Sequence, residues 1–317
     1  MPSSTPQASP VPPAAFRRDA RAPYLLQPSS DLPLIRRVHS APIAWWLWWN
    51  VLSLDAPAVA CLWAILFLRS AGIRPPLSTL SALAIAVWLI YTFDRLLDSR
   101  TSRSHNELLL QKRHFFCARH RFAFTAMAVA ASVVLLFLCK EYLPLAALRA
   151  GLFWGAIVLL YLCFIHSGAR GAAGLMPKEI AVGLIFAAGT SVPLWSLGER
   201  ISLHSAMVTL LFGLLCSLNC LAIECWESSS PENSLLKPTP WIGWTDLHLN
   251  QLAAFVAIAA QLARFLPGSR ELPLLAISLA AILILLLNIS RKSLSQESLR
   301  VLVDAALVVP ALLALFY

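Results

Sequence analysis

Long apolar runs recur along most of this chain, and they restrict its fold more than any other feature of the sequence. Each run is about 20 residues long, the length of α-helix that crosses the hydrocarbon core of a bilayer. Of the 317 residues, 58% are hydrophobic and 13% are charged, a composition that a soluble domain of this size does not need. We therefore expect an all-α, polytopic membrane protein. About nine spans can be delimited, at residues 43–69, 76–97, 120–139, 144–166, 179–198, 203–225, 248–266, 272–290 and 299–316.

The N-terminal segment differs from the rest of the chain. Pro, Ser and Ala dominate it, and large apolar residues are few. Such a segment cannot bury enough surface to fold. We therefore expect residues 1–41 to be a disordered cytoplasmic tail and residues 42–317 to form the transmembrane domain. The segment also lacks the charged start, short apolar core and small-residue cleavage site of a secretory signal peptide.

Basic residues set the expected orientation of the spans. With the N-terminus in the cytoplasm, the tail and the loops after the second, fourth, sixth and eighth spans bring most Lys and Arg side chains to the cytoplasmic face, as the positive-inside rule requires. This distribution also accounts for the formal net charge of +9, so no nucleic-acid partner is expected. We expect an integral protein of the cell inner membrane with a cytoplasmic N-terminus and, after nine spans, an external C-terminus.

Two acidic pairs stand at the ends of apolar runs. Asp94 and Asp98 close the second span, and Glu224 and Glu227 close the sixth. Residues three or four apart share one face of a helix, and Asn219 lies close to the face of the second pair. Carboxylates at the margin of a span are costly unless they serve a site, and oxygen ligands suit Mg²⁺. We expect both pairs to share one cytoplasmic site for Mg²⁺ and a diphosphate.

Cationic residues near these pairs are candidate ligands for the phosphate oxygens. Arginine binds such oxygens in a bidentate manner and lysine binds them as a point charge. The candidates are Arg95, Lys112, Arg113, Arg119 and Lys178. The alternative for the first acidic pair is a salt bridge with neighbouring arginines, and for the second pair an ordinary position flanking a loop.

Two further acids are open to interpretation. Asp55 and Pro57 interrupt a tryptophan-rich stretch of the kind that gathers at membrane interfaces, so we expect an interfacial helix up to Asp55 and then a span that Asp55 caps. Asp304 lies within the last span, where it is either a cap or a polar contact between helices.

The end of the second span carries a recognisable motif. Residues 90–98 read Ile-Tyr-Thr-Phe-Asp-Arg-Leu-Leu-Asp. The Asp-Arg-x-x-Asp half resembles the first signature of the UbiA superfamily of intramembrane prenyltransferases, Asn-Asp-x-x-Asp-x-x-x-Asp, including the arginine that is common there. Ile90 and Tyr91 replace the Asn-Asp half, so one metal ligand of the family pattern is absent.

Two further segments resemble the same family. Residues 219–227 read Asn-Cys-Leu-Ala-Ile-Glu-Cys-Trp-Glu, which keeps the asparagine and a terminal acid of the family's motif on the sixth helix. Residues 178–183 read Lys-Glu-Ile-Ala-Val-Gly, and with Gly189 and the Pro-Leu-Trp of residues 193–195 they look like its fifth helix. A basic residue there commonly reaches the diphosphate.

Over residues 43–317 the resemblance implies a UbiA-like bundle that transfers an isoprenyl group from a prenyl diphosphate to a lipophilic or aromatic acceptor. It implies catalytic roles for Asp94 and Asp98, and a pocket position for Tyr91. Mg²⁺ would be held by Asp94, Asp98, Asn219, Glu224 and Glu227, and the diphosphate by Arg95, Lys112, Arg113, Arg119 and Lys178. The alternative is a transporter or noncatalytic membrane protein that uses its acids for ion binding or helix packing.

Overall fold

The computed structural model describes residues 48–101, 116, 119–166, 177–198, 202–229, 240–266 and 271–316, with the backbone alone at 98–101, 166 and 240. The chain divides between Pro42 and Ile43, and all described helices belong to the second unit. The predicted tail, residues 1–41, lies outside the described residues. Within the described ranges every regular element is helical, which confirms the all-α class.

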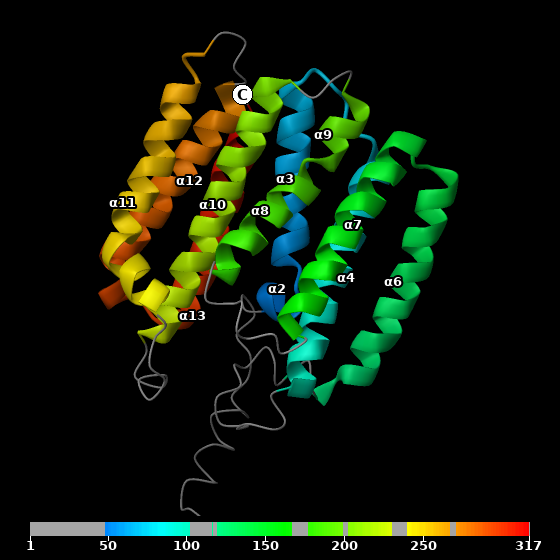
Figure 1. Ribbon diagram of the computed structural model, residues 1–317, viewed down its shortest axis with the longest axis horizontal. Coiled ribbons are helices and arrows are strands. Elements are labelled where there is room, and N and C mark those ends of the chain that lie inside the picture. The colour runs from blue at the N-terminus through cyan, green and yellow to red at the C-terminus, as the bar shows by residue number, and fades with distance from the viewer. Residues whose placement is uncertain are drawn as a thin grey trace, which may run out of the picture. The chain divides into compact units, whose positions relative to one another are not determined.

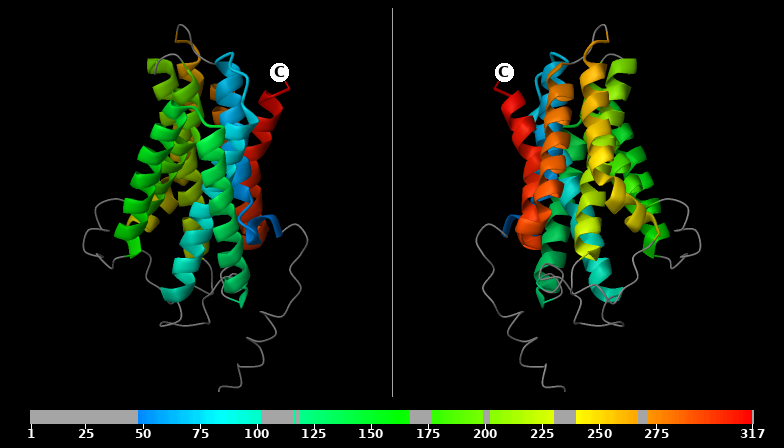
Figure 2. Two further views of the ribbon diagram at one scale, coloured as in Figure 1. Left: turned by 90° about the vertical axis from the view of Figure 1, so that its right-hand side faces the viewer. Right: turned by 90° about the vertical axis from the view of Figure 1, so that its left-hand side faces the viewer.

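The helices follow the predicted apolar runs, and the long ones lie along a common direction (Figures 1 and 2). Six stretches of the described chain are long and apolar enough to cross a membrane, which supports an integral membrane protein, but the count of nine spans is not confirmed. These stretches contain α4, α6, α7, α8 with α9, α10, and α12; α3, α11 and α13 lie at the other three predicted positions. The bounds are α2 (Trp48–Val51), α3 (Asp55–Ser70), α4 (Leu77–Thr101), α6 (Arg121–Glu141), α7 (Leu145–His166), α8 (Lys178–Thr190), α9 (Val192–Leu197), α10 (Leu203–Ser228), α11 (Pro240–Ala263), α12 (Glu271–Ser290), η5 (Arg291–Ser293) and α13 (Gln296–Ala314).

The core forms around α10, which packs against α8, α11, α12 and α13. Trp63 of α3 is fully buried in this core and stacks on Phe212 of α10 with ring centroids 4.4 Å apart. Its indole Nε1 donates to the carbonyl oxygen of Leu307 in α13 at 3.1 Å. An indole without this acceptor would leave a polar group unsatisfied in an apolar interior. Three helices are therefore joined through one side chain.

Small residues allow α8 and α10 to approach closely. A Cβ added at Gly183 of α8 would collide with the backbone of Ser217 in α10. The Ser217 hydroxyl instead donates to the carbonyl oxygen of Ile180 at 3.2 Å, and Thr209 of α10 donates to the Ser191 hydroxyl at 3.0 Å. Helices in lipid associate through such close packing and interhelical hydrogen bonds, because lipid tails are as apolar as the side chains. This contact places the start of α8 beside the end of α10.

The consecutive helices α6 and α7 pack much less. Their principal contacts are with different helices: α6 lies against α4, and α7 lies against α8, α9 and α4. Helix α6 buries Phe124 and Ala128, and Ala147 is the one fully buried residue of α7 between residues 145 and 165. Figure 1 shows α6 at the edge of the bundle. Most of their apolar surface is thus left for lipid.

The first predicted span differs from the structure near its start. A short helix, α2, ends at Val51, and a turn with Ser53 at a φ of 57° precedes α3. Asp55 is the first residue of α3, whose N-cap is Leu54, so the prediction that Asp55 caps the helix is wrong. Its carboxylate accepts a hydrogen bond from the Asn50 side chain at 2.9 Å and so ties α3 to α2.

Candidate functional site

Ionisable side chains from four helices meet at one end of the bundle, which we call the acidic end. Lys178 of α8 lies 3.7 Å from the Glu179 carboxylate and 4.0 Å from the Glu224 carboxylate of α10. The Tyr161 hydroxyl of α7 donates to the carbonyl oxygen of Lys178 at 3.5 Å. It also lies within electrostatic range of Asp94 of α4. Carboxylate, phenol and ammonium groups therefore converge beside otherwise apolar helices.

The local sequence explains the position of the lysine and its neighbour. Helix α8 begins at Lys178, directly after Pro177, which is its N-cap. Pro177 has no N–H to satisfy, so it suits the start of a helix. Glu179 stands in the first turn, where the helix dipole stabilises a negative charge. The helix start thereby fixes one positive and one negative side chain at the acidic end.

The second acidic pair is divided between two partners. Glu224 lies next to Lys178 of α8, whereas Glu227 forms an ion pair with Arg300 of α13. The Glu227 and Arg300 side chains are 22% and 16% exposed, so the pair is largely enclosed. The Glu227 carboxylate thus joins α10 to α13, and the expectation that both glutamates serve one site stays a prediction.

The first acidic pair is described in part. Asp94 is half-buried on α4, and the side chain of Asp98 lies outside the described residues. Helix α4 packs chiefly on α3 and α6, whereas α10 packs chiefly on α8 and α11. The two helices that carry the acidic pairs are thus linked mainly through α3, α7 and α8, with Tyr161 standing between Asp94 and Glu179.

Arg95 has a different position from the one expected of a phosphate ligand. Its side chain is 5% exposed. One guanidinium nitrogen donates to the carbonyl oxygen of Val51 and another to that of Asn50, each at 2.9 Å. Trp88, also on α4, donates to the Leu52 carbonyl at 3.1 Å. These bonds satisfy carbonyl groups at the end of α2, so Arg95 anchors α2 to α4 and is not available on an open surface.

The remaining predicted phosphate ligands are less defined. Lys112 and Arg113 lie outside the described residues. Arg119 is exposed just before α6. Of the cations predicted to bind phosphate, Lys178 is therefore the one that the described structure brings next to acids of the predicted site.

A second polar layer, which we call the interior cluster, was not recognised as a unit from the sequence. It comprises Tyr91 of α4, Asn219 and Cys220 of α10, and Asp304 of α13. The Asn219 amide nitrogen donates to the Asp304 carboxylate at 3.5 Å, while its buried Oδ1 has no hydrogen-bond partner among the described residues. Tyr91 lies within electrostatic range of Cys220 and Asp304. An acid inside a span was the signal that could have identified it.

The interior cluster also decides between the two interpretations of Asp304. The residue lies well inside α13, which begins at Gln296 and is capped by Ser295. It accepts a hydrogen bond from Asn219 of α10. Asp304 is therefore a polar contact between helices and not a helix cap.

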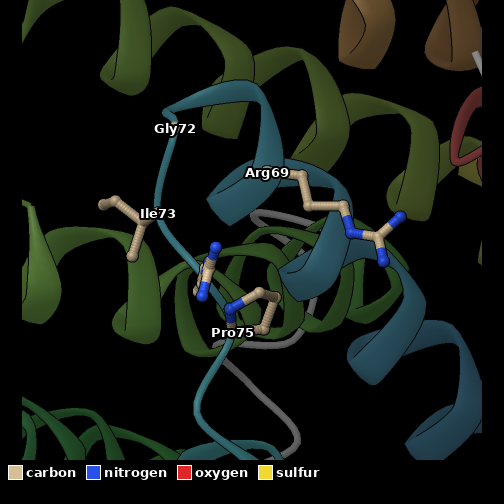
Figure 3. A pocket seen from close by; sticks show the side chains of 5 residues that line it. Arg69, Gly72, Ile73 and Pro75 are labelled. Atoms are coloured by element: carbon tan, nitrogen blue, oxygen red, sulfur yellow. The ribbon is translucent and has the colours of Figure 1, made fainter.

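A surface pocket lies at the opposite end of α4 from Asp94. It has a volume of about 530 Å³ and is lined by Arg69, Gly72, Ile73, Arg74 and Pro75 in the turn between α3 and α4 (Figure 3). None of the acidic residues discussed above lines it. The convergence of ionisable side chains, and not this pocket, therefore defines the candidate site for chemistry.

Comparisons with known proteins add no further assignment. No family model matches the chain, and no curated protein or solved structure matches it significantly.

Proposed function

We propose that this protein transfers an isoprenyl group from a prenyl diphosphate to a lipophilic or aromatic acceptor within the membrane, in the manner of the UbiA superfamily. One observation carries the proposal. Tyr161 from α7, Lys178 from α8 and Glu224 from α10 meet at one end of a bundle of apolar helices, and Asp94 stands at the same end of α4. This is the arrangement that an amphiphilic substrate with an anionic head and an apolar tail requires.

We propose roles toward the prenyl diphosphate for Lys178, for the apolar helices and for Tyr91. The Lys178 ammonium would bind its oxygens, because it already lies between two carboxylates and can exchange one of them for a phosphate oxygen. The apolar helices would exclude water from the reacting carbon and so prevent hydrolysis. Tyr91, half-buried on α4 one turn before Asp94, would line the space that we propose for the prenyl chain, which is separate from the surface pocket between α3 and α4.

Within the described residues no group of three His, Cys, Asp or Glu side chains lies close enough to hold a metal ion, so Mg²⁺ would have to bind together with the diphosphate oxygens. Asp94 and Glu224 offer carboxylate oxygens, and the unpaired Oδ1 of Asn219 is a further hard oxygen ligand. Asp98 would be a further carboxylate ligand of Mg²⁺. Glu227 could bind Mg²⁺ only after its ion pair with Arg300 is broken. Bound Mg²⁺ would neutralise the diphosphate and favour its departure.

One observation favours a second function. Lys178, Glu179 and Glu224 form an ion cluster among themselves. Such a cluster at the margin of a span is also typical of membrane proteins that bind or move ions or use ion pairs for packing. The second proposal is therefore a noncatalytic or transport role for the same residues.

Exposed tryptophans support placing the acidic end at a membrane interface. Trp48 and Trp49 of α2 and Trp241 and Trp244 of α11 are between 41% and 50% exposed, and both segments lie at this end of their helices. Indole rings favour the headgroup region. Together with the basic loops, this supports our proposal that the acidic end faces the cytoplasm of a cell inner membrane.

The first test is binding of radiolabelled farnesyl diphosphate to the purified protein in lipid nanodiscs, with Mg²⁺ or with a chelator. We expect Mg²⁺-dependent binding that falls at least about tenfold in Asp94→Asn, which removes the charge and keeps the size. The matched control is Glu141→Gln, at the far end of α6, which should bind as the wild type does. Binding that is absent, or equal with the chelator, would reject this function in favour of the noncatalytic alternative.

A further inference from the structure

The turn between α3 and α4 presents two arginines beside a cavity. Arg69 ends α3, and Arg74 precedes α4; both are exposed and both line the pocket of about 530 Å³. Pockets of roughly 300–1,000 Å³ commonly hold small-molecule ligands. Figure 3 shows Arg69 and Ile73 extending to opposite sides of the turn, with Pro75 between them. One side of the turn thus carries Arg69, and the other carries Ile73.

The backbone of the turn is held in place. Gly72 has a φ of 72°, a conformation that glycine adopts without strain. The amide of Ile73 donates to the Leu68 carbonyl at 2.9 Å, and that of Gly72 donates to the Arg69 carbonyl at 2.9 Å. Pro75 restricts the chain that follows. The two arginines are therefore attached to an ordered segment and not to a long loop.

Arg69 and Arg74 differ in their hydrogen bonds. Arg69 donates one hydrogen bond, at 3.3 Å, to the carbonyl oxygen of Leu315 at the end of α13. Its guanidinium has five N–H groups, so most of its donor capacity remains. Within the described part of the chain, Arg74 forms no hydrogen bond or ion pair. Two guanidinium groups with spare donors favour an anionic, multidentate ligand such as a phosphate.

Apolar side chains beside the turn indicate what carries the phosphate. Leu77, which begins α4, is 81% exposed, and Phe316, next to the residue that Arg69 contacts, is 82% exposed. Both belong to the same end of the bundle as the turn, because Leu77 begins α4 and Phe316 follows α13. A ligand with a charged head and apolar chains satisfies the arginines and these side chains together, whereas a free phosphate ion satisfies the arginines alone.

We propose that Arg69 and Arg74 form a binding site for the headgroup phosphate of an anionic phospholipid in the leaflet opposite the acidic end. The lipid phosphate lies in the pocket of the turn, and its acyl chains run along the surface marked by Leu77 and Phe316. The site is independent of the proposed transferase reaction, because it lies at the other end of α4 from Asp94.

The test uses the full chain purified in a neutral detergent. Thermal unfolding is followed while a phosphatidylglycerol, a phosphatidylcholine or inorganic phosphate is added, and the apparent Kd is taken from the shift in Tm. We expect saturable stabilisation by phosphatidylglycerol alone. Because a charge-assisted contact is lost, Arg74→Gln should raise the apparent Kd about tenfold. This variant is preferred to Arg69→Gln, which would also remove the bond to Leu315.

The matched control is Arg149→Gln, an exposed arginine of α7 near the same end of the bundle. It should keep the wild-type response. Three outcomes would overturn the proposal: equal stabilisation by phosphatidylcholine, an unchanged Kd in Arg74→Gln, or an equal loss in Arg149→Gln, which would show a nonspecific charge effect. Stabilisation by inorganic phosphate at similar concentration would show that the site takes a free anion and not a lipid.

Discussion

Helices α10 and α7 are both long and apolar, yet they have opposite relations to the rest of the protein. Helix α10 buries most of its residues against four other helices, whereas α7 buries little more than Ala147. In a bilayer, apolar character alone does not bring helices together, because lipid offers an equally apolar environment. The difference therefore comes from shape and polar bonds: α10 has Ser217 and Phe212 in close interhelical contacts, and α7 has few such contacts.

The surroundings of the glycines show the same difference in packing between α8 and α10 on one side and α7 on the other. On α8 and α10, Gly183 and Gly213 each face a neighbouring helix so closely that a Cβ would collide. On α7, Gly151 and Gly155 meet nothing within 4 Å in the described chain. Identical residue types thus serve tight packing in one region and leave open surface in the other.

The largest expected effect concerns the two tryptophans that mark these regions. Trp63→Ala should lower the free energy of unfolding by about 3–5 kcal/mol, because it empties a fully buried site and breaks the bond to Leu307. Trp154→Ala on α7 should cost about 1 kcal/mol, because its ring is half exposed and lies 6.0 Å from Trp195. Denaturant titration in detergent measures both. Similar losses for the two would show that α7 is as tightly integrated as the core.

The next effect sharpens the glycine comparison. Gly183→Leu should cost about 3 kcal/mol or more, because its side chain would force α8 away from Ser217. Gly155→Leu should change the free energy of unfolding by less than about 0.5 kcal/mol, since its side chain would enter open space. Thermal unfolding of the two variants in the same detergent is the measurement. A tolerated Gly183→Leu would mean that α8 and α10 can separate without loss.

The positions of the helices could be predicted because the start and end of each apolar run in the sequence indicate where a helix begins and ends. The expected spans at 203–225 and 120–139 agree with α10 and α6 to within a few residues. The prediction was poorer where a run contains a break. The run 43–69 includes the turn at Ser53, and the run 179–198 divides at Thr190, after which Pro193 stands in the first turn of α9. Asp55 and Pro57 indicated the first of these breaks, whereas the second falls among apolar and small residues that hydropathy does not distinguish.

The candidate site could be predicted less completely. The sequence placed acids at the ends of two helices, and Asp94 and Glu224 do lie at one end of the bundle. It could not show that Glu227 turns to Arg300, because residues three apart on a helix differ by about 60° in direction and can reach different neighbours. Nor could it show that Arg95 binds the carbonyls of α2, since those acceptors carry no side-chain signature.

The smallest expected effect compares two ion pairs of α10, the largely enclosed pair with Arg300 of α13 and the more exposed pair with Lys178 of α8. In double-mutant cycles with Gln at each position, Arg300 and Glu227 should show a coupling energy of about 1 kcal/mol, because both side chains are largely enclosed. Lys178 and Glu224 are 59% and 34% exposed and should couple by less than about 0.5 kcal/mol.

Salt provides the internal control for these cycles. Raising the ionic strength to about 1 M shortens the Debye length to about 3 Å and should abolish the coupling of the exposed pair, while the enclosed pair should keep most of its coupling. A coupling energy between Lys178 and Glu224 larger than that between Arg300 and Glu227 would show that the ion pair at the acidic end contributes substantially to the stability of the protein. Lys178 would then be a structural residue, and its proposed exchange of a carboxylate for a substrate phosphate would have to be abandoned.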